Sequence, residues 1–84
     1  MDATQVEQIL AENLSLSFLQ VKANGSHYEV IAVGECFTDT TRVKQQQLIY
    51  GPLMDKIADG TIHAISIKAY TPAQWERDKK LMQL

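Results

Sequence analysis

The chain has 84 residues, 45% of them hydrophobic and 21% charged, and these proportions describe one small globular domain spanning residues 1–84. Eight basic against ten acidic residues give a net charge of −2, which argues against a protein that coats nucleic acid by bulk electrostatics. A single cysteine excludes an internal disulfide, no apolar run approaches a membrane span, and the first residues do not resemble a secretory signal, so we expect a cytoplasmic protein.

The N-terminal part of the chain predicts a helix followed by a β-hairpin. Apolar residues recur at helical spacing through residues 4–13, and Thr4 followed by Glu7 fits a capping box. Apolar and polar residues then alternate, and Asn24-Gly25 is a dipeptide that favours a tight turn. We therefore expect a hairpin over residues 17–34.

The second half predicts a divided helix, a strand and a last helix. One helical face continues as far as Asp59-Gly60 and consists of Val43, Gln47, Tyr50, Leu53, Met54 and Ile57. Since proline lacks the amide hydrogen, Gly51-Pro52 predicts a helix that ends near Tyr50 and a second short helix over 52–58. Residues 64–70 follow as a strand, and residues 71–74 combine an N-cap, a proline and a capping glutamine that open the last helix.

The resulting order is α-β-β-α-α-β-α, an α+β fold in which helices cover one face of a three-stranded mixed sheet. The hairpin makes the first two strands antiparallel. A helical crossover joins the second and third strands, which favours a parallel pair. The starts of these two strands then lie at the same end of the sheet.

Each of the two histidines, His27 and His63, stands at the start of one of these two strands. The parallel arrangement brings them together at one end of the sheet, where neutral imidazoles can ligate zinc, iron or copper. The alternative is structural: His63 shares the parity of Ile65 and Ile67 and fits the edge of the core, and His27 fits a solvated turn.

Enzymatic chemistry has little support in the sequence. Cys36 lies about nine residues from His27 along an extended strand, so it has no base beside it, and a buried structural thiol is favoured. The chain shows no GxSxG elbow, no CxxC pair, and glycines too widely spaced for a phosphate loop. A binding or carrier role is the better expectation.

Nucleic-acid binding stays open as an alternative. Arg42, Lys44 and Lys56 fall on the predicted middle helices, and Lys68 falls on the third strand. The order of elements is compatible with a KH-like module, but Tyr50-Gly51-Pro52-Leu53 stands where such modules carry a GxxG clamp. Solvated surface lysines also explain this pattern.

Three stretches resemble the BolA family, and within it the branch of small bacterial acid-stress proteins. They are residues 25–34 with Gly25-Ser26-His27-Tyr28, residues 42–53 ending in Tyr50-Gly51-Pro52-Leu53, and residues 62–75, where a strand-opening histidine precedes Thr71-Pro72 and Trp75. The similarity covers nearly the whole chain. It implies a KH-like fold of class II, in agreement with the order of elements above.

The resemblance also implies a function. Members of this family partner with monothiol glutaredoxins and co-ligate a bridging 2Fe-2S cluster through the strand-opening histidine and a ligand from the preceding hairpin loop. These correspond to His63 and His27 here. A glutaredoxin cysteine and glutathione would complete the four ligands, so the isolated chain, a monomer or weak dimer, should not hold the cluster by itself.

A second activity of the family, DNA-binding regulation, is the alternative function. Its candidate contacts are Arg42, Lys44, Lys68 and Lys79. With a net charge of −2 and no clamp loop, we expect only weak and strongly salt-dependent binding.

Overall fold

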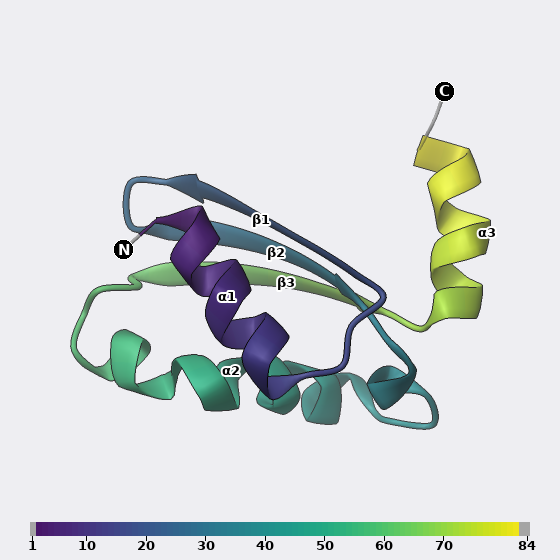
Figure 1. Cartoon of the computed structure of the whole chain (residues 1–84), viewed down its shortest axis with the longest axis horizontal. Helices are drawn as coiled ribbons and strands as arrows, with labels where there is room; N and C mark the ends of the chain where they lie inside the picture. The colour runs from purple at the N-terminus through teal and green to yellow at the C-terminus, as the bar shows by residue number, and fades with distance from the viewer. Residues whose placement is uncertain (1, 83–84) are drawn as a thin grey trace.

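The computed structural model describes residues 2–82 of the chain, and the side chains of residues 2–78. Figure 1 shows the elements, which are α1 (Ala3–Asn13), β1 (Phe18–Asn24), β2 (His27–Val33), the 3-10 turn η1 (Glu35–Phe37), α2 (Arg42–Ala58), β3 (Ala64–Tyr70) and α3 (Pro72–Met82). Among the described residues, none of the helices is both long enough and apolar enough to span a bilayer.

The sheet has the order β1-β2-β3, with β1 and β2 antiparallel and β2 and β3 parallel. Helices α1 and α2 pack on the same face of the sheet, and α3 extends from the end of β3 (Figure 1). The α+β class, the mixed sheet and the parallel pair are therefore confirmed. The predicted order of elements is also confirmed, except that the single helix α2 stands where two consecutive middle helices were predicted.

The cap of α1 differs from the prediction. The carboxylate of Asp2 accepts a hydrogen bond from the backbone N–H of Gln5 at 2.9 Å, and the Gln5 side-chain oxygen accepts one from the N–H of Asp2 at 2.8 Å. The capping box thus begins at Asp2 rather than at Thr4. A carboxylate at this position both caps the helix and complements the positive end of its dipole.

The hairpin is confirmed, but its turn lies one residue later than predicted. Asn24 pairs with His27, so Gly25 and Ser26 form the two-residue loop. Only Gly25 needs a positive φ, at 63°, which an L side chain adopts at a cost.

Helix α2 runs unbroken from Arg42 to Ala58 with Pro52 inside it, so the predicted division at Gly51-Pro52 is wrong. The proline costs one backbone hydrogen bond. On either side of it, however, Ile49 and Leu53 are fully buried against the sheet. Burying one such side chain contributes about 1.5–3 kcal/mol, so the two together offset the defect.

Replacing Gly51 with alanine should stabilise the protein. Gly51 is an exposed interior position of α2, and, apart from its chain neighbours and the backbone of its own helix, a methyl group there would meet no atom within 4 Å. Glycine is less favourable than alanine inside a helix by about 0.5–1 kcal/mol, and crowding of the new Cβ against the Pro52 ring takes back part of that gain, so we expect the free energy of unfolding to rise by about 0.5 kcal/mol. Urea denaturation followed by circular dichroism measures this change, and an unchanged or lower midpoint would contradict it.

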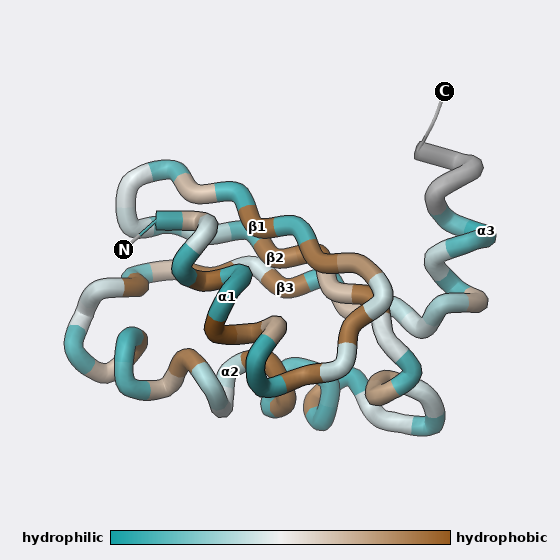
Figure 2. Tube along the Cα trace, in the orientation of Figure 1, coloured by the Kyte–Doolittle hydropathy of each residue, from teal (hydrophilic) through white to brown (hydrophobic). Residues whose placement is uncertain are grey.

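The core lies between the sheet and the two helices. Figure 2 shows hydrophobic segments of the strands and helices facing one another there. Its buried members are Val6, Leu10, Val21, Tyr28, Val30, Ala32, Phe37, Ile49, Leu53 and Ile62. The predicted face of α2 was partly wrong, because Val43 is 63% exposed and Met54 is 53% exposed, while Ile49 is fully buried.

A second apolar cluster joins α3 to the other face of the sheet. The Trp75 ring stacks on Phe18 with ring centroids 5.0 Å apart and meets Tyr70 at 5.4 Å. Phe18 and Tyr70 are the register partners of Val33, which is 1% exposed. The Thr71 hydroxyl and the Gln74 side chain cap α3 as predicted.

Candidate functional site

His63 is placed by the turn that leads from α2 to β3. Gly60 has a φ of 84°, and the Asp59 carboxylate accepts a hydrogen bond from the Thr61 N–H at 2.8 Å. Hydrogen bonds from Thr61, through its side chain and its backbone, lower the pKa of Asp59. Ile62 then enters the core at 2% exposure. This anchor leaves the next residue, His63, exposed at the start of β3.

His27 reaches the same end of the sheet from the hairpin. It is the first residue of β2, and its register partner in β3 is Ala64. The backbone N–H of His63 donates a hydrogen bond of 3.0 Å to the carbonyl oxygen of Ser26, the residue before His27. The predicted convergence of the two histidine positions is therefore confirmed at the level of the backbone.

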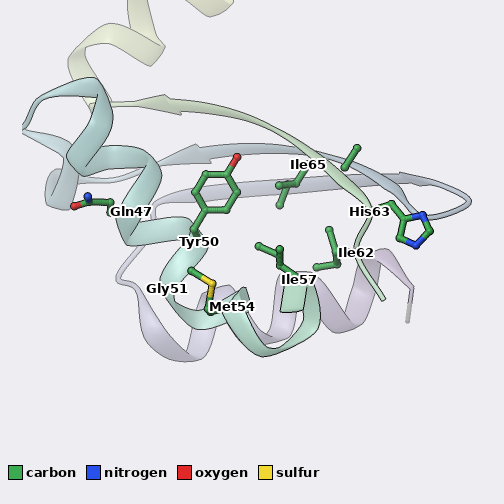
Figure 3. A pocket seen from close by; sticks show the side chains of 9 residues that line it. Gln47, Tyr50, Gly51, Met54, Ile57, Ile62, His63 and Ile65 are labelled. Carbon is green, nitrogen blue, oxygen red and sulfur yellow. The ribbon is translucent and has the colours of Figure 1, made fainter. Parts of the chain in front are cut away.

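The side chains of the two histidines line different hollows. His63 lies at the rim of a hollow of about 560 Å³ between α2 and β3, and its ring points away from Tyr50 (Figure 3). His27 lines a hollow of about 590 Å³ with Lys22 and Glu29 on the hairpin. The two hollows adjoin, since Ala64 and Ile65 line both.

The two histidines together are too few side chains to make a complete metal site. Both imidazoles are exposed, and the described residues contain no group of three or more His, Cys, Asp or Glu side chains close enough to hold a metal ion. Structural metal sites in proteins usually have four protein ligands. An ion or cluster bound at this end of the sheet would therefore need ligands from another molecule.

Cys36 lies far from both histidines along the sheet, within η1, and is half-buried. Burial raises the pKa of its thiol. The thiolate is the reactive form, so this environment favours an unreactive packing residue, in line with the structural interpretation from the sequence.

Alkylation of Cys36 should be slow at neutral pH. Because its pKa is raised, the thiol stays protonated to a higher pH than a free cysteine, and the alkylation rate should rise only at that higher pH. Mass spectrometry of the folded chain with iodoacetamide from pH 7 to 10 gives this profile, and the urea-unfolded chain is the control. A folded chain that reacts faster than the unfolded one would contradict the assignment.

Two of the four predicted basic contacts share a hollow. Arg42 and Lys68 line a common hollow of about 190 Å³ between the start of α2 and β3. Lys44 is exposed on α2 but does not line that hollow. Lys79 lies outside the residues whose side chains the structure describes.

Comparison with known proteins agrees with this geometry. The family model described as BolA-like protein matches residues 5–74, which include both histidines and all three strands. The chain belongs to the BolA family. This BolA-like protein is 56% identical over 81 residues to the acid stress protein IbaG of Escherichia coli K12, a match that covers 96% of each chain.

Solved structures confirm the fold of this BolA-like protein. A Bol-like protein from Babesia bovis superposes with a TM-score of 0.82 at 25% identity, over 94% of both chains. The BolA domain of SufE1 from Arabidopsis thaliana superposes with a TM-score of 0.76 at 29% identity, over 84% of this chain and 92% of that one.

Several residues near the site escaped the sequence analysis. The unpaired backbone groups on the outer side of β3 could not be predicted, because the sequence does not show that β3 is an edge strand of the sheet. Met54 was assigned to the core, although it is 53% exposed and lines the hollow at whose rim His63 lies.

Proposed function

We propose that this BolA-like protein is a non-enzymatic partner of a monothiol glutaredoxin, with which it shares a bridging 2Fe-2S cluster as cargo. The single observation that carries the proposal is the hydrogen bond from the His63 N–H to the Ser26 carbonyl, which places two exposed histidines at one end of the sheet. His63 is the principal ligand in this proposal, and His27 is the second.

The donor chemistry supports a shared cluster rather than a resident one. A 2Fe-2S cluster takes four ligands, and histidine can replace cysteine on one iron. The two imidazoles supply half of that number. A glutaredoxin cysteine and glutathione supply the two thiolates, which this chain cannot provide at that end because its only cysteine lies in η1.

The two ligands differ in how firmly the fold holds them. The backbone of His63 is fixed by the buried neighbour Ile62 and by the bond to Ser26. His27 lines the neighbouring hollow, so its ring must turn toward that of His63 for both to reach one cluster. His63 therefore binds first in this scheme, and His27 completes the site when the partner docks.

Anaerobic titration of the chain into cluster-loaded monothiol glutaredoxin tests the proposal. We expect a new visible circular dichroism spectrum that saturates at one chain per glutaredoxin, together with a heterodimer on size-exclusion chromatography. A spectrum that stays that of the glutaredoxin homodimer at excess chain would refute the shared cluster.

The relation to the acid stress protein of Escherichia coli suggests that acid releases the cluster. A histidine nitrogen ligates a metal only when it is unprotonated, so protons compete with iron for both imidazoles. The visible absorbance of the heterodimer should fall as the pH is lowered from 8 to 5. The control is the glutaredoxin homodimer, whose cluster is ligated by thiolates alone. Parallel curves for the two complexes would show that the histidines do not control release.

A further inference from the structure

The two edges of the sheet are covered differently. At the β1 edge, α1 packs alongside, and the Glu7 carboxylate accepts a hydrogen bond of 3.1 Å from the backbone N–H of Val21. At the other edge, β3 pairs only with β2, and no described segment pairs with its outer side. An open strand edge is a template for another strand, and proteins usually cover it.

The hydrogen-bonding pattern shows which groups of β3 point outward. The Ala64 N–H donates to the Ser26 carbonyl, and the Tyr70 carbonyl accepts from the Gly34 N–H, so both residues face β2. Successive peptide groups alternate in direction along a strand, so Ile65, Ile67 and Ala69 present theirs to the free edge. In the described part of the chain, no turn, loop or helix backbone accepts a hydrogen bond from the N–H groups of these three residues, and their direction takes them away from β2.

Two hollows follow one another beside this edge, both between α2 and β3. The larger is apolar, with Tyr50, Met54, Ile57 and Ile65 in its lining (Figure 3). The smaller is lined by residues from the start of α2 and the end of β3. Since α2 and β3 run in opposite directions along their shared length, the two hollows lie in line, and Gln46 of the smaller is next in the chain to Gln47 of the larger. We call the two hollows together the α2–β3 groove.

The smaller end of the α2–β3 groove is basic. Arg42 and Lys68 both line it, and the single ion pair among the described side chains joins Arg77 to Asp78 instead. Two cations without an acidic partner favour an acidic side chain on whatever occupies the groove. The occupant must therefore offer apolar groups at one end and a carboxylate at the other.

We propose that the α2–β3 groove binds an extended, acidic segment of a partner protein by strand addition to β3. The segment's backbone pairs with Ile65, Ile67 and Ala69, its alternate apolar side chains enter the larger hollow, and its carboxylate meets Arg42 and Lys68. Main-chain hydrogen bonds supply affinity and the hollows supply specificity in this mode of recognition. The proposal requires neither the cluster nor the glutaredoxin.

A second copy of the chain fits this edge less well. Antiparallel pairing of two β3 strands about Ile67 would bring the two Lys68 side chains together as diagonal neighbours. Like charges facing one another across a strand pair are destabilising, and an edge lysine is a common protection against self-pairing. Charge therefore favours an acidic partner over a second copy.

Selection from a random octapeptide display library against the immobilised full-length chain tests the proposal. We expect peptides that alternate apolar and polar residues and carry an acidic residue near one end. With Arg42→Glu, that end of the selected peptides should change from acidic to basic. Lys44→Glu is the matched control, because it makes the same charge change on the same helical turn outside the groove, and its consensus should stay acidic.

Removal of single backbone donors tests the strand pairing itself. Ala69→Pro deletes one outward N–H on an edge strand, where proline is tolerated, and we expect it to weaken binding of a selected peptide about tenfold. N-methylation of those alternate peptide residues whose N–H groups face β3 should weaken binding. N-methylation of the other alternate residues should not. Because the N-methylated peptides leave the protein unmodified, this experiment tests the strand pairing without any change to the fold of the protein.

Four outcomes would overturn the proposal. The first two are a library that enriches no peptide and a consensus that Arg42→Glu does not change. The third is a concentration-dependent dimer that Ala69→Pro abolishes, since this would assign the edge to self-pairing. The fourth is an Arg42-dependent gel shift of a 20-nucleotide DNA, with displacement of the selected peptide by that DNA. None of these experiments contains glutaredoxin or a cluster, so their failure leaves the histidine proposal standing.

Discussion

Replacing His63 with alanine should abolish the cluster-bridged heterodimer with monothiol glutaredoxin. His63 is the better fixed of the two proposed ligands, and its loss removes one of four bonds to the cluster. Mutation of residues that only orient metal ligands lowers metal affinity by about 10–100-fold. Loss of a ligand itself should therefore lower the affinity for the cluster at least as much. Visible circular dichroism of the mixture should then remain that of the glutaredoxin homodimer.

The matched variant is His27→Ala. His27 lines the adjoining hollow, and solvent or glutathione can take the place of its ring on the iron. We therefore expect this variant to form a weaker and more labile heterodimer rather than none. Both histidines are exposed, and neither substitution should shift the thermal unfolding midpoint appreciably. A heterodimer spectrum that survives His63→Ala but not His27→Ala would reverse the two roles.

The sequence predicted those parts of the fold that depend on local pattern. Alternation and the turn dipeptide located the hairpin, and the crossover length predicted the parallel pair that brings His27 and His63 together. The hairpin is set by residues close to one another in the chain, and the parallel pair follows from the length of the segment between its strands. The prediction that the two histidine positions converge was correct because strand direction alone determines it.

The sequence was misleading where long-range packing outweighs local preference. Pro52 predicted a break, yet α2 continues through it, with Ile49 and Leu53 buried on the sheet on either side. Thr4 fits a capping box, but Asp2 takes the cap, and the Glu7 carboxylate binds the edge of β1 instead. Likewise, only the assembled sheet shows that β3 is an open edge and that Met54 faces solvent.

Replacing Phe37 with alanine should destabilise the protein more than other single core substitutions. Phe37 is the largest of the fully buried side chains, at 1% exposure, and it belongs to the same cluster as Ala32 and Ile49. Truncation of a buried phenylalanine costs about 3–5 kcal/mol. A small domain has about 5–15 kcal/mol of stability in total, so the variant should lose a large part of it.

The backbone around Phe37 makes this a measurement of packing. Its carbonyl accepts hydrogen bonds from the Thr40 hydroxyl at 2.6 Å and the Gln45 side chain at 3.3 Å, and its N–H donates to Gly34 at 3.2 Å. Alanine keeps all three hydrogen bonds, because they use the backbone of residue 37. The loss of stability therefore measures the effect of the cavity left by the missing ring. We expect the thermal midpoint to fall by about 10 °C or more, and Phe37→Leu to recover most of it.

The position of Phe37 also separates stability from the site. It lies in η1, at the end of β2 opposite to the His27 end, so the histidines keep their places in whatever fraction of the variant is folded. At a temperature where Phe37→Ala is still folded, its titration into cluster-loaded glutaredoxin should match that of the native chain. A fall of only about 1 kcal/mol in stability would show that the core collapses around the missing ring.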